Sequence, residues 1–117
     1  MYIGELAKST GATPKAIRLY ESLGLLGRVT RMGAYRVYTA QHVTQVRLIK
    51  QAQAMGFRLA DVGASMQGGK AEPNWAAMAE QVDLRRAQIA QEIVRLQQLD
   101  AQLQAINIEI RACAELA

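Results

Sequence analysis

Residues 3–26 read IGELAKSTGATPKAIRLYESLGLL, and this stretch decides the fold of the N-terminal half. Its first apolar residues have helical spacing and end at residues 9–11 (Ser-Thr-Gly), a typical helix stop. Thr13 and Pro14 predict the start of a second helix, because threonine can cap free amide groups and proline suits the first helical position. The second helix is expected to end at Gly24. Two short helices joined by a glycine-containing turn are typical of a helix-turn-helix.

The next stretch, residues 27–38, reads GRVTRMGAYRVY and predicts two short strands around a turn at Gly33. Thr39 is a candidate cap for a third helix that ends at Gly56. A short fourth helix is expected over residues 59–67. We therefore divide the chain into a helix-turn-helix head (residues 1–67), a linker (68–73) and a long helix (74–117).

The long helix is predicted from a repeat that contains neither proline nor glycine. Apolar residues recur every seven positions from Val82 to Ile110, which is typical of a coiled coil. The rest of the chain is too short to cover such a stripe, so we expect a second copy to do so in a two-fold homodimer. The repeat itself does not distinguish parallel from antiparallel helices. The predicted interface residues are Val82, Ile89, Ile93, Leu96, Leu99, Leu103, Ile106 and Ile110.

Charge is distributed unevenly along the chain. Residues 1–58 hold nine basic and two acidic side chains (9 − 2 = +7), whereas residues 59–117 hold five basic and eight acidic ones (5 − 8 = −3). A basic lobe followed by an acidic one indicates that only the first lobe meets a polyanion such as nucleic acid.

Several classes of protein are disfavoured by the same residues. Neither a signal peptide nor a membrane-spanning run is apparent, and the single cysteine suits a reducing compartment, so we expect a cytoplasmic protein that does not bind membranes. We find no nucleophile–base set and no phosphate-binding glycine motif, and therefore expect neither an enzyme nor a bound cofactor.

Taken together, residues 3–26, the run RMGAYRVY at 31–38 and the run AMGF at 54–57 resemble the MerR family of transcription regulators. The resemblance covers residues 1–67, and the long helix matches the family's architecture. It implies a mostly α fold: a winged helix-turn-helix head with a small β-hairpin wing, a second helical wing and an antiparallel dimeric coiled coil.

The resemblance also implies which residues bind DNA. The second helix of the head would lie in the major groove of double-stranded DNA, which makes Thr13, Lys15 and Arg18 candidates for groove and phosphate contacts. Arg18 is the best candidate for a base edge, because its guanidinium can bind guanine through two hydrogen bonds. Tyr20 is a candidate for a phosphate contact through its hydroxyl group, and its alternative role is that of a core residue.

In the wing, Arg36 and Tyr38 match the family's positions for contacts with the DNA backbone. Arg31 and Arg28 would reinforce these contacts electrostatically. Near the second wing, Lys50 and Arg58 are candidates for phosphate contacts or, alternatively, solvated charges.

The sequence departs from the family pattern at several positions. Leu19 stands where an aromatic residue is usual, Gly27 where proline is common, and Gly33-Ala34 where Asn-Gly is usual. None of these changes removes a positive charge.

Members of the family usually respond to an inducer near the far end of the coiled coil, and here Cys113 is the candidate effector or redox site. The interpretation favoured by its place in the repeat is a packing thiol in the dimer seam. A metal site is disfavoured because soft metals need more than one thiolate.

His42 is interpreted as a packing or surface residue, and Trp75 as a seal between the head and the helix or, less favoured, a pocket wall.

The function expected from these features is that of a homodimeric regulator. It would bind a pseudo-palindromic operator in a promoter and distort the DNA so that RNA polymerase can engage it. The alternative is a coiled-coil interaction module that does not bind DNA specifically.

Overall fold

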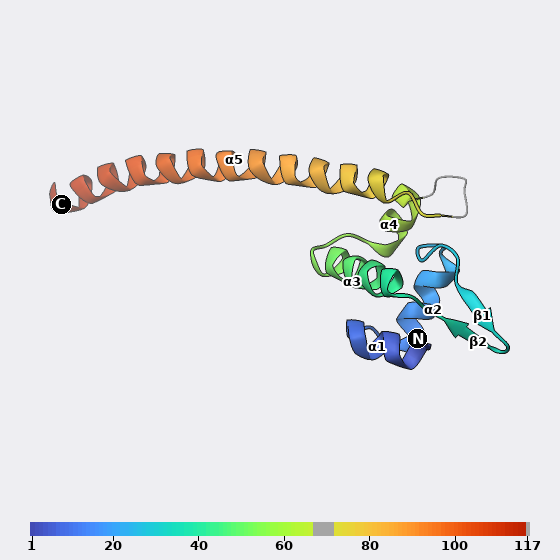
Figure 1. Ribbon diagram of the computed structural model, residues 1–117. Coiled ribbons are helices and arrows are strands. Elements are labelled where there is room, and N and C mark those ends of the chain that lie inside the picture. The colour runs from blue at the N-terminus through green and yellow to red at the C-terminus, as the bar shows by residue number, and fades with distance from the viewer. Residues whose placement is uncertain (67–71, 117) are drawn as a thin grey trace. The chain divides into compact units, whose positions relative to one another are not determined.

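The computed structural model describes residues 1–66 and 72–116 and confirms a mostly helical fold with an antiparallel hairpin and a long C-terminal helix (Figure 1). Residue 67, the predicted end of the fourth helix and of the head, and residues 68–71 of the predicted linker lie outside the described residues. The elements in chain order are α1 (Ile3–Thr10), α2 (Pro14–Ser22), β1 (Thr30–Met32), β2 (Tyr35–Val37), α3 (Ala40–Ala54), α4 (Leu59–Met66) and α5 (Trp75–Leu116).

The chain forms two compact units, Met1–Ala79 and Glu80–Ala117. The first unit extends past the predicted head because the first turn of α5 packs against its core, through Met78 and the half-buried Trp75. Such a position fits the predicted sealing role of Trp75. The fully or largely buried core of this unit consists of Leu6, Ala12, Ile17, Tyr20, Leu25, Leu26, Tyr38, Val46, Ile49, Val62, Met66 and Met78.

The predicted helix-turn-helix is present as α1, a short turn and α2. The hydroxyl of Thr10 donates to the carbonyl of Leu6 at 2.8 Å and accepts the amide of Ala12 at 3.2 Å, which ties the turn to the end of α1. Thr13 then caps α2, because its Oγ1 accepts the amide of Ala16 at 3.1 Å. These local bonds satisfy backbone groups that a helix end leaves free.

The predicted hairpin is formed by β1 and β2, with Arg31 opposite Arg36 and Met32 opposite Tyr35. The connecting turn contains only Gly33 and Ala34, and Gly33 has a φ of 63°, a conformation that side chains disfavour. Glycine at the first of two turn residues suits a type II′ hairpin, whose twist matches that of the strands. The wing therefore closes without the Asn-Gly pair that is usual in the family.

Gly27 replaces the common proline for a clear geometric reason. Its φ is 64°, whereas the proline ring fixes φ near about −65°. The loop before β1 thus follows a path that proline cannot adopt.

His42 is a packing residue, as the sequence suggested. It is 6% exposed and joins two segments of backbone. Its Nδ1 accepts the amide of Thr39 at 2.9 Å, and its Nε2 lies 3.1 Å from the carbonyl of Leu26. This pair of contacts requires the neutral tautomer with the proton on Nε2, since an amide must meet an acceptor and a carbonyl must meet a donor.

His42→Ala is expected to lower the free energy of unfolding by about 2–4 kcal/mol. The carbonyl of buried Leu26 would lose its partner, which costs about 1–3 kcal/mol, and exposed Thr39 would lose a hydrogen bond worth about 0.5–1.5 kcal/mol. Urea denaturation followed by circular dichroism measures the change. His42→Gln is the matched control. Glutamine at the third helical position can still accept a hydrogen bond from the Thr39 amide, so this variant should lose clearly less unfolding free energy than the alanine variant. A loss below about 0.5 kcal/mol for the alanine variant, the range of ordinary surface changes, would contradict the role.

Candidate nucleic-acid interface

Helix α2 presents two basic side chains on the side opposite its buried face. Ile17 and Tyr20 lie in the core, whereas Lys15 and Arg18 are exposed and, three positions apart, share one face of the helix. Thr13 is exposed at the cap just before them. The N-terminal part of α2 therefore combines positive charge with the free amides of a helix start, both of which attract anions.

Tyr20 is a core residue, and its expected phosphate contact is corrected by the structure. The residue is 3% exposed, and its hydroxyl donates to Oε1 of Gln53 on α3 at 2.7 Å. Burial also raises the pKa of this phenol above its usual value. Its aromatic ring belongs to the core cluster, so the alternative role that the sequence allowed is the one observed.

The wing carries its two arginines on one face of the hairpin. Arg31 and Arg36 are direct cross-strand partners, and such partners point to the same side of an antiparallel pair. Arg31 is exposed, and the side chain of Arg36 is 38% exposed. Like charges placed opposite each other are unfavourable unless a counter-charge is near.

Glu21 of α2 supplies that counter-charge. Its Oε1 accepts a hydrogen bond from Nε of Arg36 at 2.8 Å, and its Oε2 accepts one from the hydroxyl of Tyr38 at 3.3 Å. The carboxylate therefore joins the second helix of the helix-turn-helix to the wing. Sequence reasoning missed Glu21, and the only available signal was an acidic residue in a strongly basic segment.

Tyr38, which was expected to contact the DNA backbone, is also buried. It is 1% exposed, and its amide and carbonyl bond to Met1 in addition to the contact of its hydroxyl with Glu21. Burial, followed by the negative charge of Glu21, raises the pKa of its phenol. Tyr38 thus anchors the base of the wing, and its predicted surface contact is corrected.

Lys50 and Arg58 are exposed, as a role in binding requires. Nζ of Lys50 donates to the carbonyl of Gly11 at 2.9 Å, which places a positive charge beside the turn that precedes α2. Arg58 stands directly before α4, and its carbonyl accepts the amides of Asp61 and Val62. Lys50 thus lies close to the α1–α2 turn, whereas Arg58 belongs to the start of α4.

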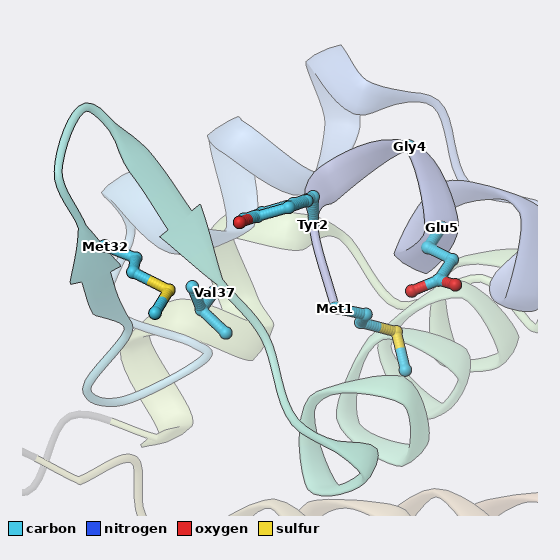
Figure 2. Close-up of a pocket in the computed structure, with 6 residues that line it drawn as sticks. All are labelled: Met1, Tyr2, Gly4, Glu5, Met32 and Val37. Carbon is cyan, nitrogen blue, oxygen red and sulfur yellow. The ribbon is translucent and has the colours of Figure 1, made fainter.

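The other face of the hairpin is apolar and borders a shallow pocket beside the start of the chain (Figure 2). The rings of Tyr2 and Tyr35 lie 5.7 Å apart on this side. The pocket is lined by Met1, Tyr2, Gly4, Glu5, Met32 and Val37. Glu5 is the one acidic or basic side chain in that lining, which offers no acid–base pair for catalysis.

On α5, the predicted interface residues form a half-exposed apolar stripe, from 39% for Val82 to 57% for Leu103 and Ile110. Cys113 is exposed on the same helix.

Over residues 1–66 and 72–116, no three His, Cys, Asp or Glu side chains come together as a metal site would need. In those same ranges no helix is apolar enough to span a bilayer.

Two family models match the chain and together cover most of it. The model described as "MerR HTH family regulatory protein" matches residues 1–69, and the one described as "MerR, DNA binding" matches residues 43–106. The chain belongs to the MerR family. Its members regulate transcription by binding DNA, so this chain is a DNA-binding transcription regulator, and the interaction-module alternative gains no support.

Individual relatives agree with the family assignment. The HTH-type transcriptional regulator CueR of Escherichia coli O6:H1 is 37% identical over 91% of this chain and 80% of its own length. CueR of Vibrio cholerae is 36% identical over 97% of this chain and 81% of its own length. The SoxR homolog of Chromobacterium violaceum is 44% identical over 55% of this chain and 43% of its own length.

Solved structures of MerR regulators share the fold. A MerR family regulator from Listeria monocytogenes superposes with a TM-score of 0.61 at 22% identity, covering 89% of this chain and 80% of the other. PbrR691 from Ralstonia metallidurans, solved in complex with lead(II), gives a TM-score of 0.54 at 26% identity, covering 89% of this chain and 82% of the other.

The buried phenol of Tyr38 provides a test of the Glu21 contact. Its raised pKa means that the folded protein holds this proton more tightly than the unfolded chain, so the resulting stability is present below pH 10.0 and is lost as the pH rises through the folded-state pKa. Ultraviolet titration of tyrosinate should therefore show late components from both Tyr38 and the buried Tyr20. Tyr38→Phe should remove one of them, and Glu21→Gln should move that same one to lower pH. A titration curve that Glu21→Gln leaves unchanged would contradict the contact.

Proposed function

We propose that this MerR regulator acts as a homodimer that binds a pseudo-palindromic operator within a promoter. The single observation that carries the proposal is the position of Lys15 and Arg18, exposed on α2 directly after the cap Thr13. In this family arrangement α2 would enter the major groove, with Arg18 at a base edge and Lys15 at a phosphate.

The wing adds contacts that set position rather than sequence. Arg31 and the outer atoms of Arg36 would bind phosphates flanking the groove, with Lys50 and Arg58 as further phosphate contacts near the second wing. Seven net positive charges in residues 1–58 support this division of labour, since backbone contacts dominate affinity and its dependence on salt.

The apolar stripe of α5 supports the homodimer. The eight predicted interface residues, from Val82 to Ile110, are each at least 39% exposed in the single chain. Burying each one is worth on the order of 1.5–3 kcal/mol when complete, far more than a surface ion pair at about 0–1 kcal/mol. A second α5 in an antiparallel coiled coil would cover the stripe and would hold two heads at a fixed separation.

Action on transcription follows from that fixed separation. If both heads bind one duplex at once, the DNA must bend or untwist to meet them, and RNA polymerase would engage the distorted promoter. We place this activity in the cytoplasm, without a resident cofactor. Cys113, exposed on α5, remains our candidate for an effector or redox response.

Lys15→Ala and Arg18→Ala should each weaken binding to duplex DNA. Loss of a phosphate contact should reduce the slope of log affinity against log salt by about 1, and loss of a base contact should cost about 1–3 kcal/mol and relax sequence preference at one position. Fluorescence anisotropy across a salt series, combined with selection of bound genomic fragments, measures both. Arg111→Ala on α5 removes the same charge and should change little, and an equal loss there would argue against a specific role for α2.

Leu96→Glu should dissociate the dimer, because it would place an uncompensated charge inside the seam. Sedimentation equilibrium at micromolar concentration reports the mass directly. Gln98→Glu is the matched control, since it adds the same charge two positions away, outside the predicted seam residues. A monomeric parent protein, or a Leu96→Glu variant that stays dimeric, would contradict the proposed interface.

A further inference from the structure

The negative charge of Glu21 is unfavourable on a surface that is proposed to bind DNA. Glu21 is one of two acidic residues in residues 1–58 and lies on α2 itself, three positions from Arg18. A carboxylate there repels phosphates and neutralises Arg36, a proposed DNA contact. It must therefore contribute something that offsets this electrostatic cost.

The geometry shows what that contribution is. The side chain of Glu21 is 20% exposed, and both of its oxygens accept hydrogen bonds from the wing, one from Arg36 of β2 and one from Tyr38 directly after that strand. Two separate bonds from one carboxylate fix distance and angle together, and bonds to a charged group are stronger than neutral ones. The carboxylate thus forms a polar clamp between α2 and the wing.

The wing needs such a clamp because it is small. Its strands contain three residues each, and an isolated two-stranded hairpin is marginally stable in water. Tyr38 anchors the base of the hairpin in the core. Arg36 lies two residues further toward the tip, where its bond to Glu21 limits how far the wing can swing.

We propose that Glu21 is a positioning residue for DNA binding, which holds Arg36 and the wing at the angle to α2 that the duplex requires. Arg36 uses Nε for Glu21, and the N–H groups of its two Nη atoms remain available to a phosphate. One carboxylate thereby orients a guanidinium that would otherwise sample many rotamers. The inference rests on the proposed function, in which α2 and the wing contact the same duplex.

The decisive test is the sign of the effect of Glu21→Ala on affinity. If Glu21 merely repels DNA, its removal frees Arg36, tightens binding and steepens the dependence on salt. If it positions Arg36, removal weakens binding by about fivefold, the order of one net hydrogen bond, and reduces the salt slope. The probe is a mixed-sequence duplex of about three helical turns, because a phosphate contact needs no particular sequence.

Three further variants separate positioning from general damage. Glu5→Ala removes the same charge from α1 and should leave affinity unchanged or slightly tighter. Glu21→Gln keeps an oxygen for Arg36 and should recover part of the lost affinity. In an Arg36→Ala background, Glu21→Ala should cause a clearly smaller loss, because only the contact with Tyr38 remains, and an undiminished loss there would overturn the proposal.

A measurement without DNA distinguishes failure of this inference from failure of the proposed function. The Nε–H resonance of Arg36 in the 117-residue chain should shift on Glu21→Ala, and an unchanged resonance would overturn the clamp. Absence of salt-sensitive duplex binding by the parent protein would instead overturn the proposed function, and the positioning role with it. Tighter binding by Glu21→Ala would overturn the positioning role alone.

Discussion

The arrangement of the head depends on the burial of one face of α2. A helix of nine residues is too short to persist in water by itself, so its existence and direction are set by tertiary packing. Ile17 and Tyr20 provide that packing, at 0% and 3% exposure. Because the side chains of one helix are rigidly spaced, fixing this inner face also fixes Lys15 and Arg18 on the outer one. The core therefore determines where positive charge meets the solvent.

Polar contacts around α2 make that position unique. Tyr20 bonds to Gln53 of α3, and His42 bonds to the backbone of Leu26. Glu21 accepts hydrogen bonds from Arg36 of β2 and from Tyr38 directly after that strand. Apolar packing alone tolerates small rotations, whereas a buried hydrogen bond is lost when its partners move apart, and the unpaired group is then costly. The second helix of the helix-turn-helix is thus tied to α3 and to the wing by directional contacts. We expect this rigidity to matter, since a DNA contact displaced by one ångström loses its hydrogen bond.

Local signals allowed much of this fold to be predicted from the sequence. The Thr13-Pro14 start of α2, the turn at Gly33 and the seven-residue repeat each act within a few residues, and each gave the element observed. The burial of Tyr20 and Tyr38 was harder to predict, because tyrosine has an apolar ring and a polar tip and suits either a core or a surface. Glu21 was missed since its partners lie 15 and 17 residues away, and they come into reach only after the hairpin has folded against α2.

The repeat in α5 carries a further geometric consequence. An ideal helix has 3.6 residues per turn, so a seven-residue stripe drifts by about 20° per heptad around a straight axis. From Val82 to Ile110 the stripe covers four heptads, which gives a drift of about 80°. One straight partner surface could not follow it, whereas a second copy with the same drift can, through a left-handed supercoil. In the proposed antiparallel pair the length of that supercoil would separate the two heads, and the spacing of the half-sites in the operator would then be a property of α5 rather than of the helix-turn-helix.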